Sequence, residues 1–179
     1  MTPFAQTLGP DLAACAPEVQ ALHRSHGTFH GQITVERPRN PLLYALGRLP
    51  NLPPQGTHDL TLEKSPNDRG ETWTRTIGPA TMRSTQWAHG TYVAEKLGPV
   101  TAIIKLIVKG GTLSMQVTGW RFCGIPMPRV LAPKVTTRET GEQGRYLFNI
   151  RIALPLIDAQ LTRYHGHLDV HLDALPDQN

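Results

Sequence analysis

The sequence lacks long apolar runs, paired cysteines and blocks of like charge, and each absence argues against a class of protein. No stretch approaches the roughly 20 apolar residues that a membrane-spanning helix needs. The two cysteines, Cys15 and Cys123, lie far apart and do not have the paired spacing of a zinc site. Lys and Arg outnumber Asp and Glu by 18 to 14, but they are scattered, so no basic stripe favours nucleic-acid binding.

A secretory signal is also missing at the start of the chain. Residues 1–10 lack the basic segment and the apolar segment that such a signal combines. Two isolated thiols are typical of a reducing compartment, although one disulfide between Cys15 and Cys123 stays open as an alternative. We therefore expect a cytoplasmic protein.

Motifs for catalysis are absent too. There is no glycine-rich turn between a strand and a helix to hold a nucleotide, and there is no nucleophile elbow. Carboxylates are few, and we expect most of them in turns or on polar strand faces, so no acid–base pair can be nominated. The sequence predicts no catalytic residue and no cofactor, and it leans towards a non-catalytic protein without deciding the matter.

Turn-forming residues are abundant, with 16 glycines and 16 prolines. Beyond Gly56 they separate short segments of β-type sequence, which predict strands at 57–64, 70–77, 80–87, 91–97, 100–109, 112–122, 134–140, 145–154 and 160–170. Short turns make neighbouring strands antiparallel, and a sheet of about nine or ten strands curls more readily than it stays flat. The fold class we expect is α+β, mainly antiparallel β, as a curled meander sheet or barrel with short N-terminal helices.

The chain before Gly56 has a different pattern. We expect helix within 4–25, a strand at 28–37 and a short amphipathic helix at 40–49, which either plugs the end of the sheet or acts as a lid or a lipid-contacting helix. Together, residues 1–56 form a helix–strand–helix preface packed on the meander at 57–171, with a tail at 172–179. The whole chain, 1–179, is expected to be a single domain.

Two strand segments carry unusual patterns. Apolar residues occupy both faces of 100–109, so we expect this strand to be covered on both sides. Residues 119–134 contain three basic residues, no acidic residue and several prolines and glycines. We interpret this segment as a rigid corner that avoids regular strand pairing. An exposed apolar patch at this corner would favour docking on a partner, and a buried corner beside a cavity would favour ligand binding.

Aromatic and arginine residues within amphipathic strands are the candidate ligand-binding residues. Trp73 and Arg75 share a strand face with Ile77, and Trp120, Arg121 and Arg151 occur in similar strands. An arginine on such a face often pairs with a carboxylate, but it can also anchor an acidic head group in an apolar pocket. We predict ligand-binding roles for Trp73, Arg75, Trp120 and Arg121.

A histidine-rich segment near the C-terminus is a stronger candidate for a metal site than the early histidines His23, His26 and His30. His165, His167, Asp169 and His171 would lie on one face of a strand, and a histidine pair at i, i+2 can bind one divalent metal. The polar side of a strand explains the same pattern without a metal. We predict no metal site.

The chain resembles a bacterial family known as a domain of unknown function, DUF4166, along nearly its full length. The residues that carry the resemblance are Gly31-x-Ile33-x-Val35-Glu36-Arg37, Leu52-Pro53-Pro54-x-Gly56, Glu71-x-Trp73-x-Arg75, Glu95-x-Leu97-Gly98-Pro99, Gly119-Trp120-Arg121-Phe122-x-Gly124-Ile125-Pro126-x-Pro128 and Arg163-Tyr164-x-Gly166.

The resemblance implies little chemistry. Such domains occur alone or attached to a saccharopine-dehydrogenase-like nucleotide-binding domain, and no catalytic residue is defined in the family. His165 and His167 stand where the family pattern would have Arg and Trp, which weakens the metal interpretation further.

Two function hypotheses follow. The favoured one is non-catalytic binding of a small apolar or amphiphilic, lipid-like ligand inside the β-rich domain. The alternative is an interaction module that docks on an oxidoreductase or membrane partner through residues 119–134.

Overall fold

The computed structural model describes residues 1–38, 40, 53–155 and 157–172. The helical elements are α1 (Pro3–Leu8), the 3-10 helix η1 (Gly9–Ala14), α2 (Pro17–Arg24) and the 3-10 helix η2 (Arg129–Leu131). The strands are β1 (Gly27–Glu36), β2 (Gly56–Asn67), β3 (Gly70–Ile77), β4 (Ala80–His89), β5 (Tyr92–Leu97), β6 (Val100–Lys109), β7 (Thr112–Phe122), β8 (Ile125–Met127), β9 (Lys134–Glu142), β10 (Arg145–Ala153) and β11 (Gln160–Asp169). The amphipathic helix expected at 40–49 lies almost wholly outside the described residues.

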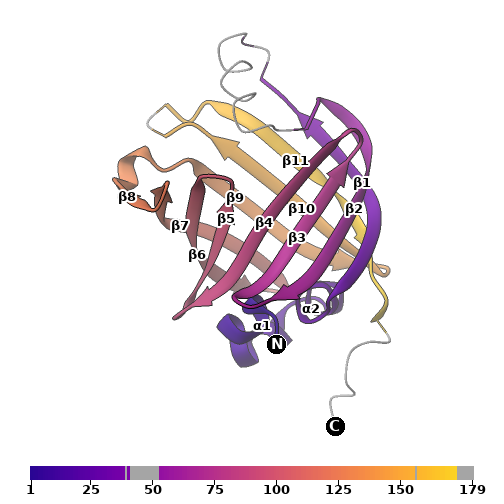
Figure 1. Ribbon diagram of the computed structural model, residues 1–179. Helices are drawn as coiled ribbons and strands as arrows, with labels where there is room; N and C mark the ends of the chain where they lie inside the picture. The colour runs from indigo at the N-terminus through magenta and orange to yellow at the C-terminus, as the bar shows by residue number, and fades with distance from the viewer. Residues whose placement is uncertain (39, 41–52, 156, 173–179) are drawn as a thin grey trace.

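The strands form a closed antiparallel barrel (Figure 1). The sheet order is β6-β5-β4-β3-β2-β1-β11-β10-β9-β7-β8, and a further pairing between β6 and β7 closes ten of these strands into a ring. The eleventh strand, β8, pairs only with the end of β7. The predicted fold class is therefore confirmed, and the barrel is the form that the meander takes.

The helical segments lie against one end of the barrel, beside the starts of β1 and β7 and the end of β11 (Figure 1). Pro17 and Glu18 stand in the first turn of α2, where proline and an acidic side chain both favour helix formation. A backbone bridge joins Cys15 to Gly111, and the Ala16 N–H donates to the Gly111 carbonyl at 2.8 Å. These contacts hold the helices as a cap on the barrel.

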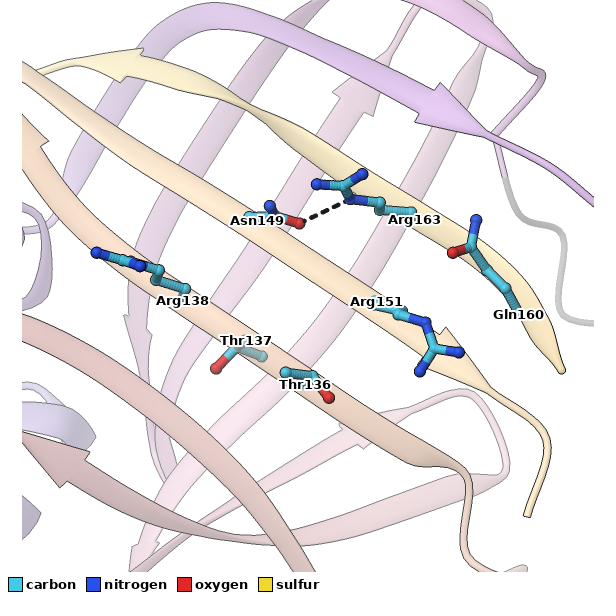
Figure 2. Close-up of a pocket in the computed structure, with 7 residues that line it drawn as sticks. All are labelled: Thr136, Thr137, Arg138, Asn149, Arg151, Gln160 and Arg163. Atoms are coloured by element: carbon cyan, nitrogen blue, oxygen red, sulfur yellow. Dashed lines mark hydrogen bonds between the residues drawn. The ribbon is translucent and has the colours of Figure 1, made fainter. Parts of the chain in front are cut away.

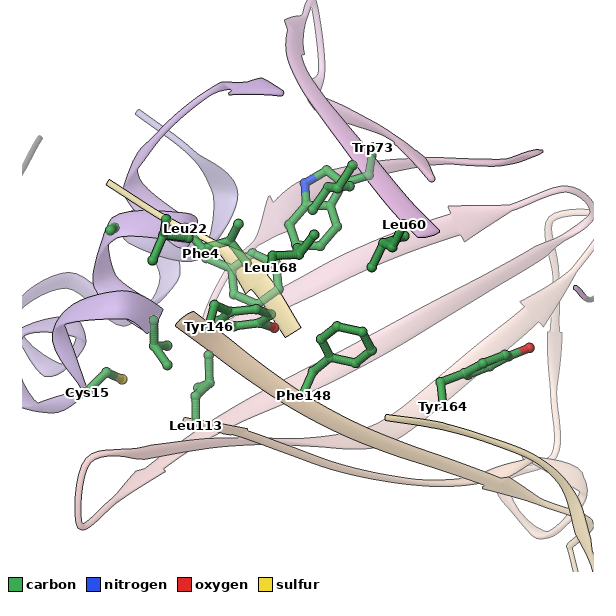
Figure 3. Close-up of a cluster of buried hydrophobic side chains, with 14 of the residues drawn as sticks. Phe4, Cys15, Leu22, Leu60, Trp73, Leu113, Tyr146, Phe148, Tyr164 and Leu168 are labelled. Carbon is green, nitrogen blue, oxygen red and sulfur yellow. The ribbon is translucent and has the colours of Figure 1, made fainter. Parts of the chain in front are cut away.

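A continuous apolar core runs from this cap into the barrel. Figure 3 shows Phe4 and Leu22 of the helical segments close to Trp73 of β3 and Tyr146 of β10. The ring of Phe4 stacks on the imidazole of His23 with their centroids 4.1 Å apart. The core is therefore densest at the helix-capped end.

Two expectations from the sequence are wrong. The outer face of β6 is not fully covered, because the Ile107 side chain is 40% exposed there. The corner at 119–134 also does not avoid regular pairing, because β8 pairs antiparallel with β7 from Trp120↔Met127 to Phe122↔Ile125.

The remaining structural findings concern cysteines and membrane spans. Cys15 and Cys123 are both free, so the disulfide alternative is not realised. Among the described helices, none has the length and apolar character that a bilayer-spanning segment requires.

Candidate ligand site in the barrel interior

The pairing register shows which side chains face the interior. Residues paired directly across two antiparallel strands lie on the same face of a sheet. Starting from buried Ile33 on β1, the register places Leu62, Arg75, Glu95 and Ala102 on the inner face of their strands. The interior therefore mixes apolar and charged side chains.

Lys64 and Glu71 form the deepest charged pair on this inner face. Both side chains are fully buried, with the Lys64 Nζ 3.8 Å from the Glu71 Oε2, and His26 places its Nε2 3.2 Å from the same oxygen. The Lys64 ammonium also donates to the Leu22 carbonyl and lies 5.0 Å from the centre of the Trp73 ring. Burial lowers the pKa of Lys64 to about 8, and the negative charge of Glu71 only partly opposes this effect.

His23, Glu139 and Tyr146 make a second buried polar group below the helical cap. The His23 Nε2 lies 2.7 Å from the Glu139 Oε2, and the Tyr146 hydroxyl donates to the Glu139 carboxylate. Burial raises the pKa of Tyr146 well above its usual value, and the charge and hydrogen bond of Glu139 raise it further. This group ties α2 to β9 and β10 inside the core.

Arg75 and Glu95 form a third pair, closer to the end of the barrel opposite the helices. The Arg75 Nη2 donates to the Glu95 Oε1 at 3.3 Å, and its Nη1 donates to the Ser84 Oγ at 2.9 Å. The guanidinium also stacks over the Trp73 ring, 4.8 Å from its centre. Burial alone would raise the pKa of Glu95, but the charge of Arg75 and hydrogen bonds from Ser84 and Gln86 lower it overall.

Solvent reaches this third pair although it faces the interior. The side chains of Arg75 and Glu95 are 24% and 26% exposed, whereas Lys64 and Glu71 are fully buried. Inward-facing apolar side chains around the pair are likewise only half-buried, namely Met82, Leu97, Val100, Ala102, Trp120, Val135, Ile150 and Ile152. At this end, the inner face of the barrel is therefore mainly apolar and partly solvent-accessible, and it carries one ion pair.

The structure brings some of the predicted ligand-binding residues together and separates others. Trp73 and Arg75 are neighbours on β3, and Trp120 shares the inner face with Ala102. The Trp120 indole N–H donates to the Pro128 carbonyl at 3.1 Å. Arg121 is exposed on the opposite, outer face of β7. Ligand-binding roles for these residues stay predictions.

The sequence interpretation missed most of the interior polar residues. Glu71 and Glu139 were expected in turns or on polar strand faces, but they are buried on the inner face. The signal that could have found them is the period of two. Lys64 follows Leu60 and Leu62, and Glu139 follows Val135, each at alternate positions on a strand.

A hollow lies on the outer face of β9, β10 and β11. Figure 2 shows this groove, which has a volume of about 270 Å³ and is lined by Thr136, Thr137, Arg138, Asn149, Arg151, Gln160 and Arg163. Arg151 already donates to the Asp158 carboxylate at 3.1 Å, and Arg163 donates to the Asn149 amide oxygen at 3.0 Å. Arg151 thus lies outside the barrel, away from the interior pair.

The histidine-rich segment is on β11. His165 lies with its Nε2 3.2 Å from the Glu36 Oε1, in a partly exposed contact. Within the part of the chain that the structure describes, no group of three or more His, Cys, Asp or Glu side chains could hold a metal ion.

Comparison with known proteins supplies the family but no activity. A search of curated proteins finds no match. The family described as "Domain of unknown function (DUF4166)" matches residues 16–168, which span β1 to β11 and α2. The match covers the interior strands, the helical cap from Ala16 onwards and the corner at 119–134. The chain therefore belongs to the DUF4166 family.

Proposed function

We propose that this domain binds a small apolar or amphiphilic, lipid-like ligand in the solvent-accessible half of the barrel interior. The observation that supports the proposal is the exposure of Arg75 and Glu95 on the inner face, 24% and 26%, among half-buried apolar side chains. An apolar wall with a few convergent polar groups is the usual composition of a ligand site.

The ion pair limits the chemistry of the ligand's polar end. The Arg75 guanidinium can donate hydrogen bonds, and the Glu95 carboxylate can accept them. Because Trp73 stacks on Arg75 and Ser84 accepts from it, the guanidinium is held in one orientation. A hydroxyl or protonated carboxyl head group could donate to Glu95 and accept from Arg75, whereas a carboxylate could bind Arg75 alone. The alkyl part of the ligand would lie against Trp120, Ala102 and Ile150.

The proposal is tested first on the purified protein. Native mass spectrometry and solvent extraction should recover a co-purifying amphiphile, or the protein should take up a C16 fatty acid or C16 alcohol added as a probe. Failure of all of these would overturn the proposal.

A matched pair of substitutions tests the location. Ala102→Trp adds a large side chain on the inner face opposite Trp120, and Thr101→Trp adds the same side chain on the outer face of the same strand. We expect Ala102→Trp to weaken C16 binding at least about tenfold, because the indole would occupy the ligand volume. Thr101→Trp should bind as the wild type does. Equal binding by both variants would place the ligand elsewhere.

A third variant tests the head-group contact. Arg75→Met keeps an unbranched side chain on the inner face but removes the donors. It should weaken binding of the C16 acid more than binding of hexadecane, because only the acid has a head group for Arg75.

A further inference from the structure

The tip of the β7–β8 hairpin and the adjoining η2 helix expose a set of large apolar side chains. We call this the corner surface, and its apolar members with their exposed fractions are Phe122 (47%), Ile125 (65%), Val130 (59%) and Leu131 (44%). Isolated exposed apolar residues are ordinary on a protein surface, but four of them within ten positions make a concentrated apolar surface.

The corner surface is held in a defined shape. Cys123 and Gly124 have φ angles of 49° and 83°, as the two-residue turn of a hairpin requires. The Cys123 N–H donates to the Pro99 carbonyl at 2.8 Å, which ties the tip to the turn between β5 and β6. The apolar side chains are therefore presented by fixed backbone.

The apolar face of the hairpin continues the inner wall of the barrel. Phe122 pairs with Ile125, and Trp120 pairs with Met127, so these two pairs share one face of the hairpin. Trp120 lies on the inner face opposite Ala102. An apolar path thus leads from the interior to the tip, at the end of the barrel opposite the helices (Figure 1).

The charged residues within 119–134 are all basic. Arg121, Arg129 and Lys134 are exposed there, and residues 119–134 contain no Asp or Glu. Lys134 is the only one of the three with a carboxylate that the described residues bring near, Asp158 at 3.8 Å in an exposed pair. Apolar side chains beside cations match a bilayer interface, where acyl chains lie under anionic head groups.

We propose that the corner surface docks on an anionic lipid bilayer. This inference goes beyond ligand binding in the interior, and the two fail separately: the C16 assays test the interior, and vesicle assays test the surface. Phe122 and Ile125 at the tip would enter the interface, while Arg121 and Arg129 would contact head groups.

The single exposed thiol makes the test direct. Cys123 is exposed at the tip and Cys15 is 5% exposed, so an environment-sensitive fluorophore such as NBD can be attached at Cys123 alone. With vesicles containing about one third phosphatidylglycerol, we expect a several-fold rise and a blue shift in NBD emission, as for a probe entering an apolar medium. Pure phosphatidylcholine vesicles should bind at least about fivefold more weakly, and high salt should remove most of the difference.

Substitutions in the unlabelled protein locate the contact by vesicle co-sedimentation. Ile125→Glu and Val130→Glu should each reduce binding about tenfold or more. Ile107→Glu is the matched control, because Ile107 is 40% exposed on β6 and lies outside the corner surface; it should bind as the wild type does. Arg129→Gln should weaken binding only to the anionic vesicles.

Three outcomes would overturn the proposal. The wild type could fail to bind anionic vesicles, or Ile107→Glu could weaken binding as much as Ile125→Glu. Alternatively, analytical ultracentrifugation could show a dimer that Ile125→Glu dissociates, with no vesicle binding, and the surface would then belong to a second copy of the chain.

Discussion

At the scale of single residues, the inner face of this barrel holds charged groups that are hydrogen-bonded to polar partners. Glu139 lies between His23 and Tyr146, and Arg75 lies between Glu95 and Ser84. Removing one partner of a buried pair leaves the other without compensation, which costs more free energy than the pair itself contributes. The stability of the core therefore depends on individual polar atoms.

Glu139→Gln tests this dependence. The amide keeps the shape of the side chain but removes the charge that faces His23 and the Tyr146 hydroxyl. We expect the free energy of unfolding to fall by about 2–4 kcal/mol, measured by urea denaturation at neutral pH.

Glu142→Gln is the control for the same change on the same strand, because Glu142 is exposed. It should change stability by less than about 0.5 kcal/mol. If the two variants were equally stable, the polar group under the helical cap would not contribute as we infer.

At the scale of elements, β1 and β11 approach each other through two glycines on the inner face. A Cβ atom on Gly31 would lie 2.0 Å from the His167 carbonyl oxygen, and one on Gly166 would lie 2.0 Å from that of Gln32. Both contacts are with backbone, which cannot move without disturbing the ladder. The pairing that joins the first strand to the last therefore requires glycine at these positions.

Gly31→Ala is expected to destabilise the protein by at least about 2 kcal/mol, because the methyl group would force the two strands apart. Thermal and urea unfolding would measure the loss. Gly119→Ala provides the comparison, because a Cβ there would meet the Ile103 Cβ at an ordinary 3.8 Å. A Gly31→Ala protein as stable as Gly119→Ala would contradict the close approach of β1 and β11.

At the scale of the whole molecule, the two ends of the barrel differ in burial and in the charge they can tolerate. The helix-capped end buries Lys64 completely, and the opposite half leaves Arg75 and Glu95 partly exposed. Burial at the capped end therefore shifts the pKa values of Lys64, Cys15 and Tyr146 towards their neutral forms.

The stability of the protein should rise with pH between about 8 and 10.5 through Lys64. The pKa of this lysine is about 8 in the folded protein, against an ordinary value of 10.5. Between these values the unfolded chain binds more protons than the folded one, so the lysine's contribution to stability increases with pH. The gain should be about 1–3 kcal/mol.

The measurement is the difference in free energy of unfolding between the wild type and Lys64→Met across this range. The comparison is needed because Cys15, whose pKa burial raises to about 11, and Tyr146, whose pKa is also raised, change stability in the opposite direction. A difference that did not change with pH would mean that burial does not lower the pKa of Lys64.

At the acid end, the lowered pKa of Glu95 means that its contribution to stability is lost as pH falls below the ordinary range of a glutamate.

Much of the local structure could be predicted from the sequence because it depends on neighbouring residues. The period of two and the turn residues predicted β1 and nine later strands, including β10, where Tyr146, Phe148 and Ile150 alternate with polar residues. Prolines and glycines likewise marked the early helical segment, which the structure divides into α1, η1 and α2. The pairing of Trp73 with Arg75 on one face also followed from the alternation alone.

Only the tertiary structure decided which strand face is inside. Alternation defines two faces but does not say which one a closed barrel encloses, and here the inner face includes Lys64, Glu71, Glu95 and Glu139 as well as apolar residues. Closure itself depends on the β6–β7 and β1–β11 pairings, and the second joins residues more than a hundred positions apart.

The sequence by itself determined the strands, the turns and the apolar-basic composition of 119–134. Neighbouring hairpins bring Arg75 close to Glu95, but closure of the barrel by long-range pairing decided that the face carrying both residues is the interior.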